Sequence, residues 1–253
     1  TINANDTSND TTSTFTTGGG NDVIIIADIA GGNDTFSAGA GDDSITIADE
    51  LGQGRAGETT TINGGDDNDT LVFGTDAFTY GNDLVISNIE TVDITVGDQS
   101  ITASTFAGDN TFTLIDQDSS SEVLTIVGDT VTGSTIDASG IVYDGFQTAD
   151  VAFTLTAGND TVTGSGGTDI VSLGDGNDLV TSPGAYTGGT ILGGSGNDRF
   201  VSAADFDSTS FDGGANNDSI LLTSSDAKFS GSTFSGGLAN DTINVSSTLL
   251  SSS

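Results

Sequence analysis

The chain contains no cysteine, histidine, methionine or tryptophan, and it has a single proline, Pro183. Without cysteine it forms no disulfide bond. Without histidine or cysteine it lacks the ligands of the usual zinc, copper, haem and iron–sulfur sites. The same absences exclude a Ser-His-Asp triad and a cysteine nucleophile. The fold must therefore be held together by other means.

Positive charge is almost as scarce. Three Lys/Arg residues stand against 37 Asp/Glu residues, which gives a formal net charge of −34 over 253 residues. Arg55, Arg199 and Lys228 cannot form the basic cluster that phosphate binding requires, so nucleic acid and anionic membrane surfaces are excluded as partners. We interpret the excess of carboxylates as a charge that divalent cations neutralise in the folded protein.

The sequence has no apolar run of about 18 residues, which predicts that it has no membrane-spanning helix. It also shows no charged segment followed by an apolar one of the signal-peptide kind, so we expect export without a visible cleavable signal. A charge this high is often found in disordered chains. Here 34% of the residues are hydrophobic and they recur at regular intervals, which favours a folded chain.

Eleven aspartates lie in turn sequences rich in glycine and asparagine, and each is followed two residues later by an apolar residue. Three of them, Asp160, Asp169 and Asp178, are nine residues apart; most of the others are separated by 20 to 26 residues. The eleven are Asp22, Asp34, Asp43, Asp69, Asp83, Asp160, Asp169, Asp178, Asp198, Asp218 and Asp241. The apolar partners are Ile24, Phe36, Ile45, Leu71, Val85, Val162, Val171, Val180, Phe200, Ile220 and Ile243.

The pattern predicts an all-β fold. Glycines permit the positive φ angles of tight turns, and in the short strand after each aspartate the apolar residue faces inward. Repeated turns and strands at a fixed step indicate a right-handed parallel β-solenoid of the β-roll type. Two nonapeptides make one coil within residues 155–180, and coils of about twenty residues are expected elsewhere.

The segment GGSGNDRFV at 193–201 resembles the RTX (haemolysin-type) calcium-binding repeat, G-G-x-G-x-D-x-U-x with U apolar, at every fixed position. The segment from Leu173 to Thr181 departs from it only at the first glycine. The resemblance implies a β-roll in which Ca²⁺ is held by the sixth-position aspartate and by backbone carbonyls of the turns. The implied ligands are the eleven aspartates, with Gly174, Gly176, Gly194 and Gly196 in the turns.

Coils of about twenty residues place one Asn-Asp turn on each coil, so we expect a column of ions along one edge, with Asp34 and Asp169 on the opposite edge. Hard oxygen ligands from successive turns are what Ca²⁺ prefers. A second interpretation stays open, because Asn-Asp sequences also make good turns in the absence of any metal.

The predicted organisation has five parts: a polar N-terminal segment at 1–16, a calcium-rich solenoid at 17–90, a calcium-poor continuation at 91–155, a second calcium-rich solenoid at 156–245, and a polar tail at 246–253. A division into two domains within 100–150 is also compatible with the sequence. In the middle part, alternation places Val85, Ile89 and Val92 on the core side, and Gly97–Ser100 is predicted to be a loop. The segment NIETVDIT at 88–95 resembles a segment found beside RTX repeats in bacterial S-layer and large surface proteins.

These features favour an extracellular or cell-surface structural protein that assembles with other copies of itself, in the presence of Ca²⁺, into a surface layer, sheath or filament. The repeats resemble those of S-layer and oscillin-like surface-fibril proteins, and cell-surface glycans are a further expected partner. The alternative is a calcium-folded binding module for ice or carbohydrate, although the repeat copies show no uninterrupted Thr-x-Thr ladder. Lyases and glycosidases on related folds use a basic residue or free carboxylates. This chain has only three basic residues, and its motif carboxylates are expected to bind metal, so we expect that the protein is not an enzyme.

Overall fold

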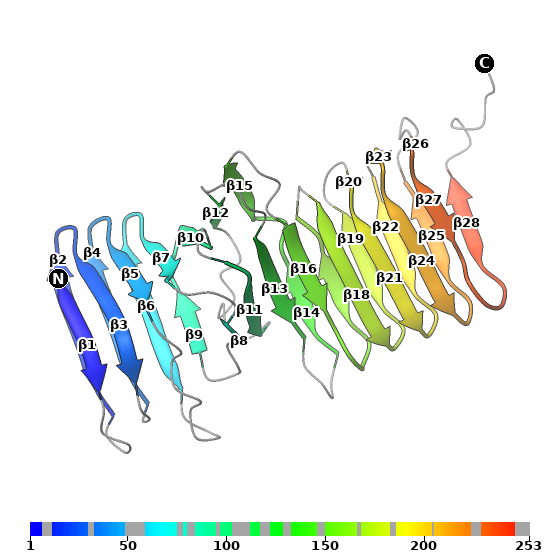
Figure 1. Ribbon diagram of the computed structural model, residues 1–253. Coiled ribbons are helices and arrows are strands. Elements are labelled where there is room, and N and C mark those ends of the chain that lie inside the picture. The colour runs from blue at the N-terminus through cyan, green and yellow to red at the C-terminus, as the bar shows by residue number, and fades with distance from the viewer. Residues whose placement is uncertain are drawn as a thin grey trace. The chain divides into compact units, whose positions relative to one another are not determined.

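The computed structural model describes residues 1–6, 12–29, 33–48, 59–74, 78–79, 84–94, 97–102, 112–116, 122–128, 133–145, 150–165, 168–182, 186–203, 205–223 and 229–245. These residues form strands and turns and include no helix. Every strand pairing with a recorded register is parallel, and successive passes of the chain return to the same sheets (Figure 1). The predicted right-handed parallel β-solenoid is confirmed.

The chain divides into two compact units. The first comprises Thr1–Leu124 and Tyr143–Ala149, and the second comprises Thr125–Val142 and Asp150–Ser253. Strands β13 (Val123–Val127) and β15 (Val142–Gly145) cross this division. The assignment of calcium-rich and calcium-poor parts within the chain stays a prediction.

The first unit contains a sheet of order β1-β3-β5-β7-β10-β12-β15, a second of order β2-β4-β6-β9, and the paired strands β8 and β11. Residues 2–6, within the predicted polar N-terminal segment, form β1, which pairs with β3. The strand bounds are β1 Ile2–Asp6, β2 Thr14–Gly19, β3 Val23–Ile29, β4 Thr35–Ala40, β5 Ser44–Ile47, β6 Thr60–Asp66, β7 Thr70–Phe73, β8 Phe78–Thr79, β9 Leu84–Ser87, β10 Thr91–Asp93, β11 Gln99–Thr102 and β12 Thr113–Asp116.

The second unit contains three sheets, of orders β27-β24-β21-β18-β16-β13, β14-β17-β19-β22-β25-β28 and β20-β23-β26. Their strand bounds are β14 Thr135–Asp137, β16 Asp150–Thr154, β17 Thr161–Thr163, β18 Asp169–Asp175, β19 Leu179–Ser182, β20 Tyr186–Thr187, β21 Thr190–Ser195, β22 Arg199–Ser202, β23 Phe206–Asp207, β24 Ser210–Ala215, β25 Ser219–Leu222, β26 Phe229–Ser230, β27 Thr233–Ser235 and β28 Thr242–Val245.

Strand register confirms the predicted coil lengths. Thr161 aligns with Leu179, which is one coil of two nonapeptides, and Leu179 aligns with Arg199 in the next, wider coil. Hydrogen bonds between equivalent turn residues join positions 18, 20, 20 and 23 apart in the second unit and 21 and 26 apart in the first. Coils of different length therefore stack in one ladder because the extra residues are accommodated between the strands.

The core is the inner face of every strand. Nine of the eleven apolar residues that follow the motif aspartates are at most 2% exposed: Ile24, Phe36, Ile45, Leu71, Val162, Val171, Val180, Phe200 and Ile220. Ile243, in the last described coil, is 54% exposed because no described strand covers it. Burial of these side chains, at about 25 cal/mol per Å² of apolar surface, is the main metal-independent contribution to stability.

Two predictions for the middle of the chain are wrong. In β9 the core-facing residues are Leu84 and Ile86, and Val85 faces outward. Three consecutive apolar residues leave the phase of a strand undetermined, and a shift of one residue exchanges the two faces. The segment Gly97–Ser100 is not wholly a loop, since Gln99 and Ser100 begin β11 and the Gln99 side chain is buried.

Candidate metal centre

The second unit contains a ladder of aspartates, one on each coil. Oδ1 of each aspartate accepts a hydrogen bond from the backbone N–H of the equivalent residue one coil earlier. We call this set the second ladder. Its donor–acceptor pairs and N···O distances are Ser134–Asp160 (2.5 Å), Asp160–Asp178 (2.7 Å), Asp178–Asp198 (2.9 Å), Asp198–Asp218 (2.8 Å) and Asp218–Asp241 (3.0 Å).

The first unit has an equivalent, shorter set, which we call the first ladder. The backbone N–H of Asp22 donates to Asp43 Oδ1 (2.7 Å), and that of Asp43 donates to Asp69 Oδ1 (2.9 Å). In the next coil a glutamate takes the place of the aspartate. The backbone N–H of Asp69 donates to Glu90 Oε2 (2.8 Å). The structure thus brings eight of the eleven predicted aspartates into two ladders.

An outer ladder of asparagines runs beside the second ladder in the opposite direction. The side-chain oxygens of Asn159, Asn177, Asn197 and Asn217 each accept from the backbone N–H of the asparagine in the following coil, at 2.7–3.0 Å. Each Asn-Asp pair is therefore hydrogen-bonded to both neighbouring coils. The asparagine side chain accepts from the following coil, and the aspartate side chain accepts from the preceding coil. These hydrogen bonds explain why the dipeptide recurs. They also support the interpretation that Asn-Asp turns stack without a metal ion.

The predicted turn glycines lie where only glycine fits. Gly174 and Gly194 have φ angles of +96° and +104°, in the left-handed region that side chains disfavour. They stack in register, and a Cβ added at Gly194 would overlap the Gly174 carbonyl. A Cβ added at Gly196 would likewise overlap the Gly176 carbonyl. Their role in this structure is to let successive turns approach closely.

The second carboxylate oxygens of the ladders are buried and unsatisfied. Asp43, Asp69, Asp178, Asp198 and Asp218 are at most 3% exposed, and the Oδ2 atom of each has no hydrogen-bond partner. A Cβ added at Gly193 would overlap both Asp198 Oδ2 and the Gly213 carbonyl of the next coil. Burying an unpaired charged oxygen costs several kcal/mol, so a cation or a proton is required at these positions.

Burial raises the pKa of Asp198 to about 6, against the opposing effect of the Asp178 N–H hydrogen bond; the charges of Asp178 and Asp218 raise it further. Burial likewise raises the pKa of Asp69 to about 6, with smaller contributions from Asp43, Glu90 and Asp42. The pKa values of Asp178 and Asp218 are raised for the same primary reason. Arg199, the only Lys or Arg among the described residues, is exposed and does not neutralise them.

These pKa values predict a reversal of pH dependence by calcium. A carboxyl whose pKa is raised in the folded state stabilises that state when protonated, and this stabilisation is lost as the pH rises from about 4 through about 6. Calcium-free protein should therefore retain more β structure at pH 5 than at pH 7.5. With saturating Ca²⁺ the order should invert, because the ion requires the ionised carboxylate. Far-UV circular dichroism in chelator and thermal melts in Ca²⁺, each at the two pH values, measure this, and the same order in both conditions would contradict it.

The ladders fit a calcium ion by the chemistry of their donors. All the groups available are hard oxygens, they are buried, and their negative charge is unbalanced within the described residues, which is the environment Ca²⁺ prefers over softer metals. No three acidic side chains gather at one point in the described part of the chain. Each ion would therefore be held by ladder carboxylates together with turn carbonyls such as that of Gly213, and it would join adjacent coils.

Two predicted ligands, Asp34 and Asp169, lie outside the two ladders. Asp34 precedes β4 at the end opposite Asp43, where its Oδ1 accepts from Ser13 N–H (2.8 Å). Asp169 begins β18 at the end opposite Asp178, and its Oδ1 accepts from the Ser165 hydroxyl (2.5 Å). Asp83 lies outside the described residues. The ladder residue between β9 and β10 is Glu90, which sequence reasoning missed although Glu90 is also followed two residues later by a buried apolar residue, Val92.

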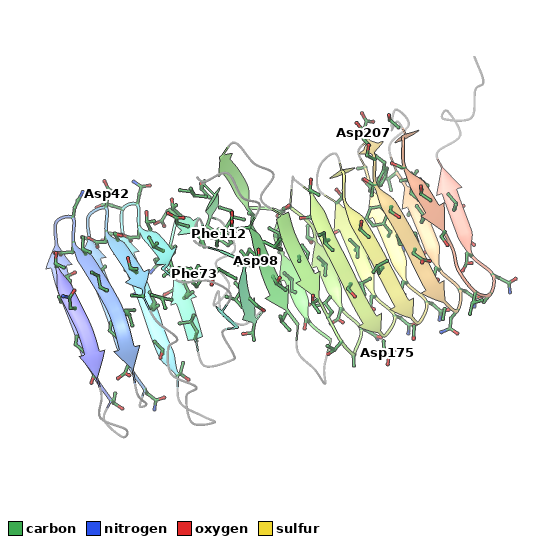
Figure 2. The ribbon with its side chains drawn as sticks, viewed as in Figure 1. Asp42, Phe73, Asp98, Phe112, Asp175 and Asp207 are labelled. Carbon is green, nitrogen blue, oxygen red and sulfur yellow. The ribbon has the colours of Figure 1, made fainter. Side chains whose placement is uncertain are left out.

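Other acidic residues of the same turns face solvent. Figure 2 shows Asp42 and Asp175 on the outer side of their turns, and both are exposed. Phe73, by contrast, lies inside its coil and is fully buried (Figure 2). Position within the turn, rather than acidity, thus decides which carboxylates join a ladder.

Comparison with protein families agrees with this geometry. The model of the RTX calcium-binding nonapeptide repeat matches four segments, at residues 30–46, 61–77, 154–180 and 190–208. They contain seven of the predicted aspartates: Asp34, Asp43, Asp69, Asp160, Asp169, Asp178 and Asp198.

Comparisons with curated proteins and with solved structures give no match. No helix in the described part of the chain is long and apolar enough to cross a membrane. The chain is therefore a parallel β-solenoid that contains RTX calcium-binding repeats in these four matched segments.

Proposed function

We propose that this is an extracellular structural protein that folds on binding Ca²⁺ and then assembles with copies of itself into a surface layer, sheath or filament. The observation that carries the proposal is the pair of buried carboxylate ladders, whose Oδ2 atoms have no hydrogen-bond partner at Asp43, Asp69, Asp178, Asp198 and Asp218. A divalent ion beside these oxygens removes two charges and connects adjacent coils in one step.

The proposed location follows from the same charge. At −34 the calcium-free chain repels itself, and a protein with such a charge stays soluble and expanded. Free Ca²⁺ is scarce in the cytosol and abundant outside the cell, so binding and folding are coupled to export. RTX-type repeats of this kind support an extracellular setting.

Support for assembly comes from the last described coil. Strands β27, β28 and β26 are each the final strand of their sheet, and so have one edge that no described strand pairs. Leu238 is 71% and Ile243 54% exposed there, whereas Ile220, one coil earlier in register with Ile243, is 2% exposed. An edge of this kind accepts a further strand, and in this proposal another copy of the chain supplies it. The other partner we propose is cell-surface glycan, and the proposal includes no catalytic role.

The test is electron microscopy of the purified chain with Ca²⁺ and with chelator. We expect ordered polymers at millimolar Ca²⁺ and dispersed particles in chelator. Mg²⁺ should substitute poorly because it demands a small octahedral shell, and NaCl at equal ionic strength should fail because screening alone does not bridge coils. Deletion of residues 1–16 should impair polymerisation more than calcium binding. A protein that folds in Ca²⁺ yet stays monomeric at high concentration would refute the assembly part of the proposal.

One observation favours the binding-module alternative. On the outer face of β2, β4 and β6, Thr14, Thr35 and Thr61 lie in register, and the neighbouring row reads Thr16, Ser37 and Asn63. In the second unit the equivalent row of β17, β19 and β22 is Thr161, Leu179 and Arg199, so the threonine row is confined to the first unit among the strands compared. A monomer that holds its fold in Ca²⁺ and binds ice or glycan through this face would favour the alternative.

A further inference from the structure

The turn between β9 and β10 departs from the repeat, because Asn88-Ile89-Glu90 replaces the Asn-Asp pair. It lies outside the four segments that match the RTX repeat. Glu90 nevertheless keeps the ladder register: its side chain accepts from Asp69 N–H, its own N–H donates to Asp69 O (3.2 Å), and its carbonyl accepts from Thr113 N–H (2.7 Å). The inserted Ile89 is buried. The longer glutamate side chain therefore compensates for the extra residue in the turn.

Oxygen atoms converge at this turn as they do in the regular repeats. Asn88 has a φ angle of +52°, which an asparagine tolerates. A Cβ added at Gly64 would overlap both the Asn88 carbonyl oxygen and Asp69 Oδ2. Gly193 in the second unit meets Asp198 Oδ2 and the Gly213 carbonyl in the same way. The Asn88–Glu90 turn thus reproduces the oxygen arrangement of the repeat without its glycine or its aspartate.

The environment of the Asp69 carboxylate is a second observation that points to a ligand here. Its side chain is fully buried and its Oδ2 atom, which lies beside the Asn88 carbonyl, has no hydrogen-bond partner. The next coil has no carboxylate at this place, since Phe112, which precedes β12 and is buried, occupies the position before the strand. The Asp69–Glu90 step is accordingly the last of the first ladder.

We propose that Asp69, the Asn88 carbonyl and Glu90 form a calcium site that closes the first ladder, with Glu90 as a ligand that the repeat motif does not specify. The inference depends on calcium being the ion of the ladders. It does not depend on assembly of the protein into polymers.

The test counts bound ions on the full chain by equilibrium dialysis with Ca²⁺ and by calorimetric titration. Glu90→Gln keeps the side-chain length and an oxygen acceptor for Asp69 N–H but removes the charge, and we expect it to bind one ion fewer than the parent protein. Asp93→Asn is the matched control, since it removes one charge from the outward face of β10, the same strand that Glu90 precedes. The control should bind the full number.

A second pair of variants fills the space instead of changing the charge. Gly64→Ala places a methyl group between Asp69 Oδ2 and the Asn88 carbonyl and should also lose one ion. Gly19→Ala has open space around its Cβ and should lose none. An unchanged ion count in Gly64→Ala, or in a folded Glu90→Gln, would overturn the inference, as would an equal loss in either control. Normal polymerisation with an unchanged count would overturn this site alone.

Discussion

Removal of Ca²⁺ by chelator is expected to unfold most of the chain. The chain has no disulfide, Arg199 is the only described Lys or Arg and is exposed, and the ladders bury a carboxylate on nearly every coil. Without a counter-ion these charges oppose stacking at neutral pH. Far-UV circular dichroism at pH 7.5 should show a largely disordered chain in chelator and a gain of β signal when Ca²⁺ is restored. A β spectrum that is the same with and without chelator would mean that apolar burial and the hydrogen-bonded turns suffice.

Replacement of Asp198 by asparagine should change stability in opposite directions with and without the ion. Asparagine retains an oxygen acceptor for the Asp178 N–H but removes a buried charge. In chelator, Asp198→Asn should therefore retain more β signal in far-UV circular dichroism than the parent. In Ca²⁺ it should melt at a lower temperature, and calcium affinity at that site should fall by more than about tenfold, since loss of even an outer partner of a metal ligand costs about 10–100-fold.

This pair of measurements separates the two interpretations of the Asn-Asp turns. If the turns were purely structural, Asp198→Asn would be neutral or stabilising in both conditions. Asp175→Asn is the matched control, because it removes one exposed charge from a neighbouring turn. Asp198→Ala should weaken the calcium site and also leave the Asp178 N–H without its acceptor. Thr181→Ala, on the outer face, should change stability by no more than about 0.5 kcal/mol. Equal calcium affinity in all these variants would show that the motif has been misread.

The repeated segments of the fold could be predicted because two signals agree there. At 169–178 and 190–198 the glycines mark the turn, the aspartate marks the start of the strand, and the residue two later marks the core face. In β9 those signals disagree, because three consecutive apolar residues leave the phase of the strand undetermined and the alternation predicts the wrong face for Val85. The strand at Gln99 was missed because a buried glutamine beside glycine and aspartate has the composition of a loop.

The ladder aspartates could be predicted, but not what each carboxylate does. Oδ1 of Asp198 accepts from a residue 20 positions earlier, and that contact depends on how coils stack rather than on local sequence. Asp34 and Asp169, which have the motif, lie at the opposite edge as expected, whereas Glu90, which lacks the motif, lies within the first ladder because it is in register with Asp69. Coil register, rather than the repeat pattern, selects the members.

The most direct test of the central claim is a crystal structure of the protein with Ca²⁺, with ions located by anomalous scattering. We predict two rows of ions, each bound at the 2.3–2.6 Å typical of calcium–oxygen bonds. One row should contact the Oδ2 atoms of Asp178, Asp198 and Asp218, and the other should contact those of Asp43 and Asp69. Ions found only at the exposed carboxylates of the turns, with the buried oxygens still without a partner, would contradict the account.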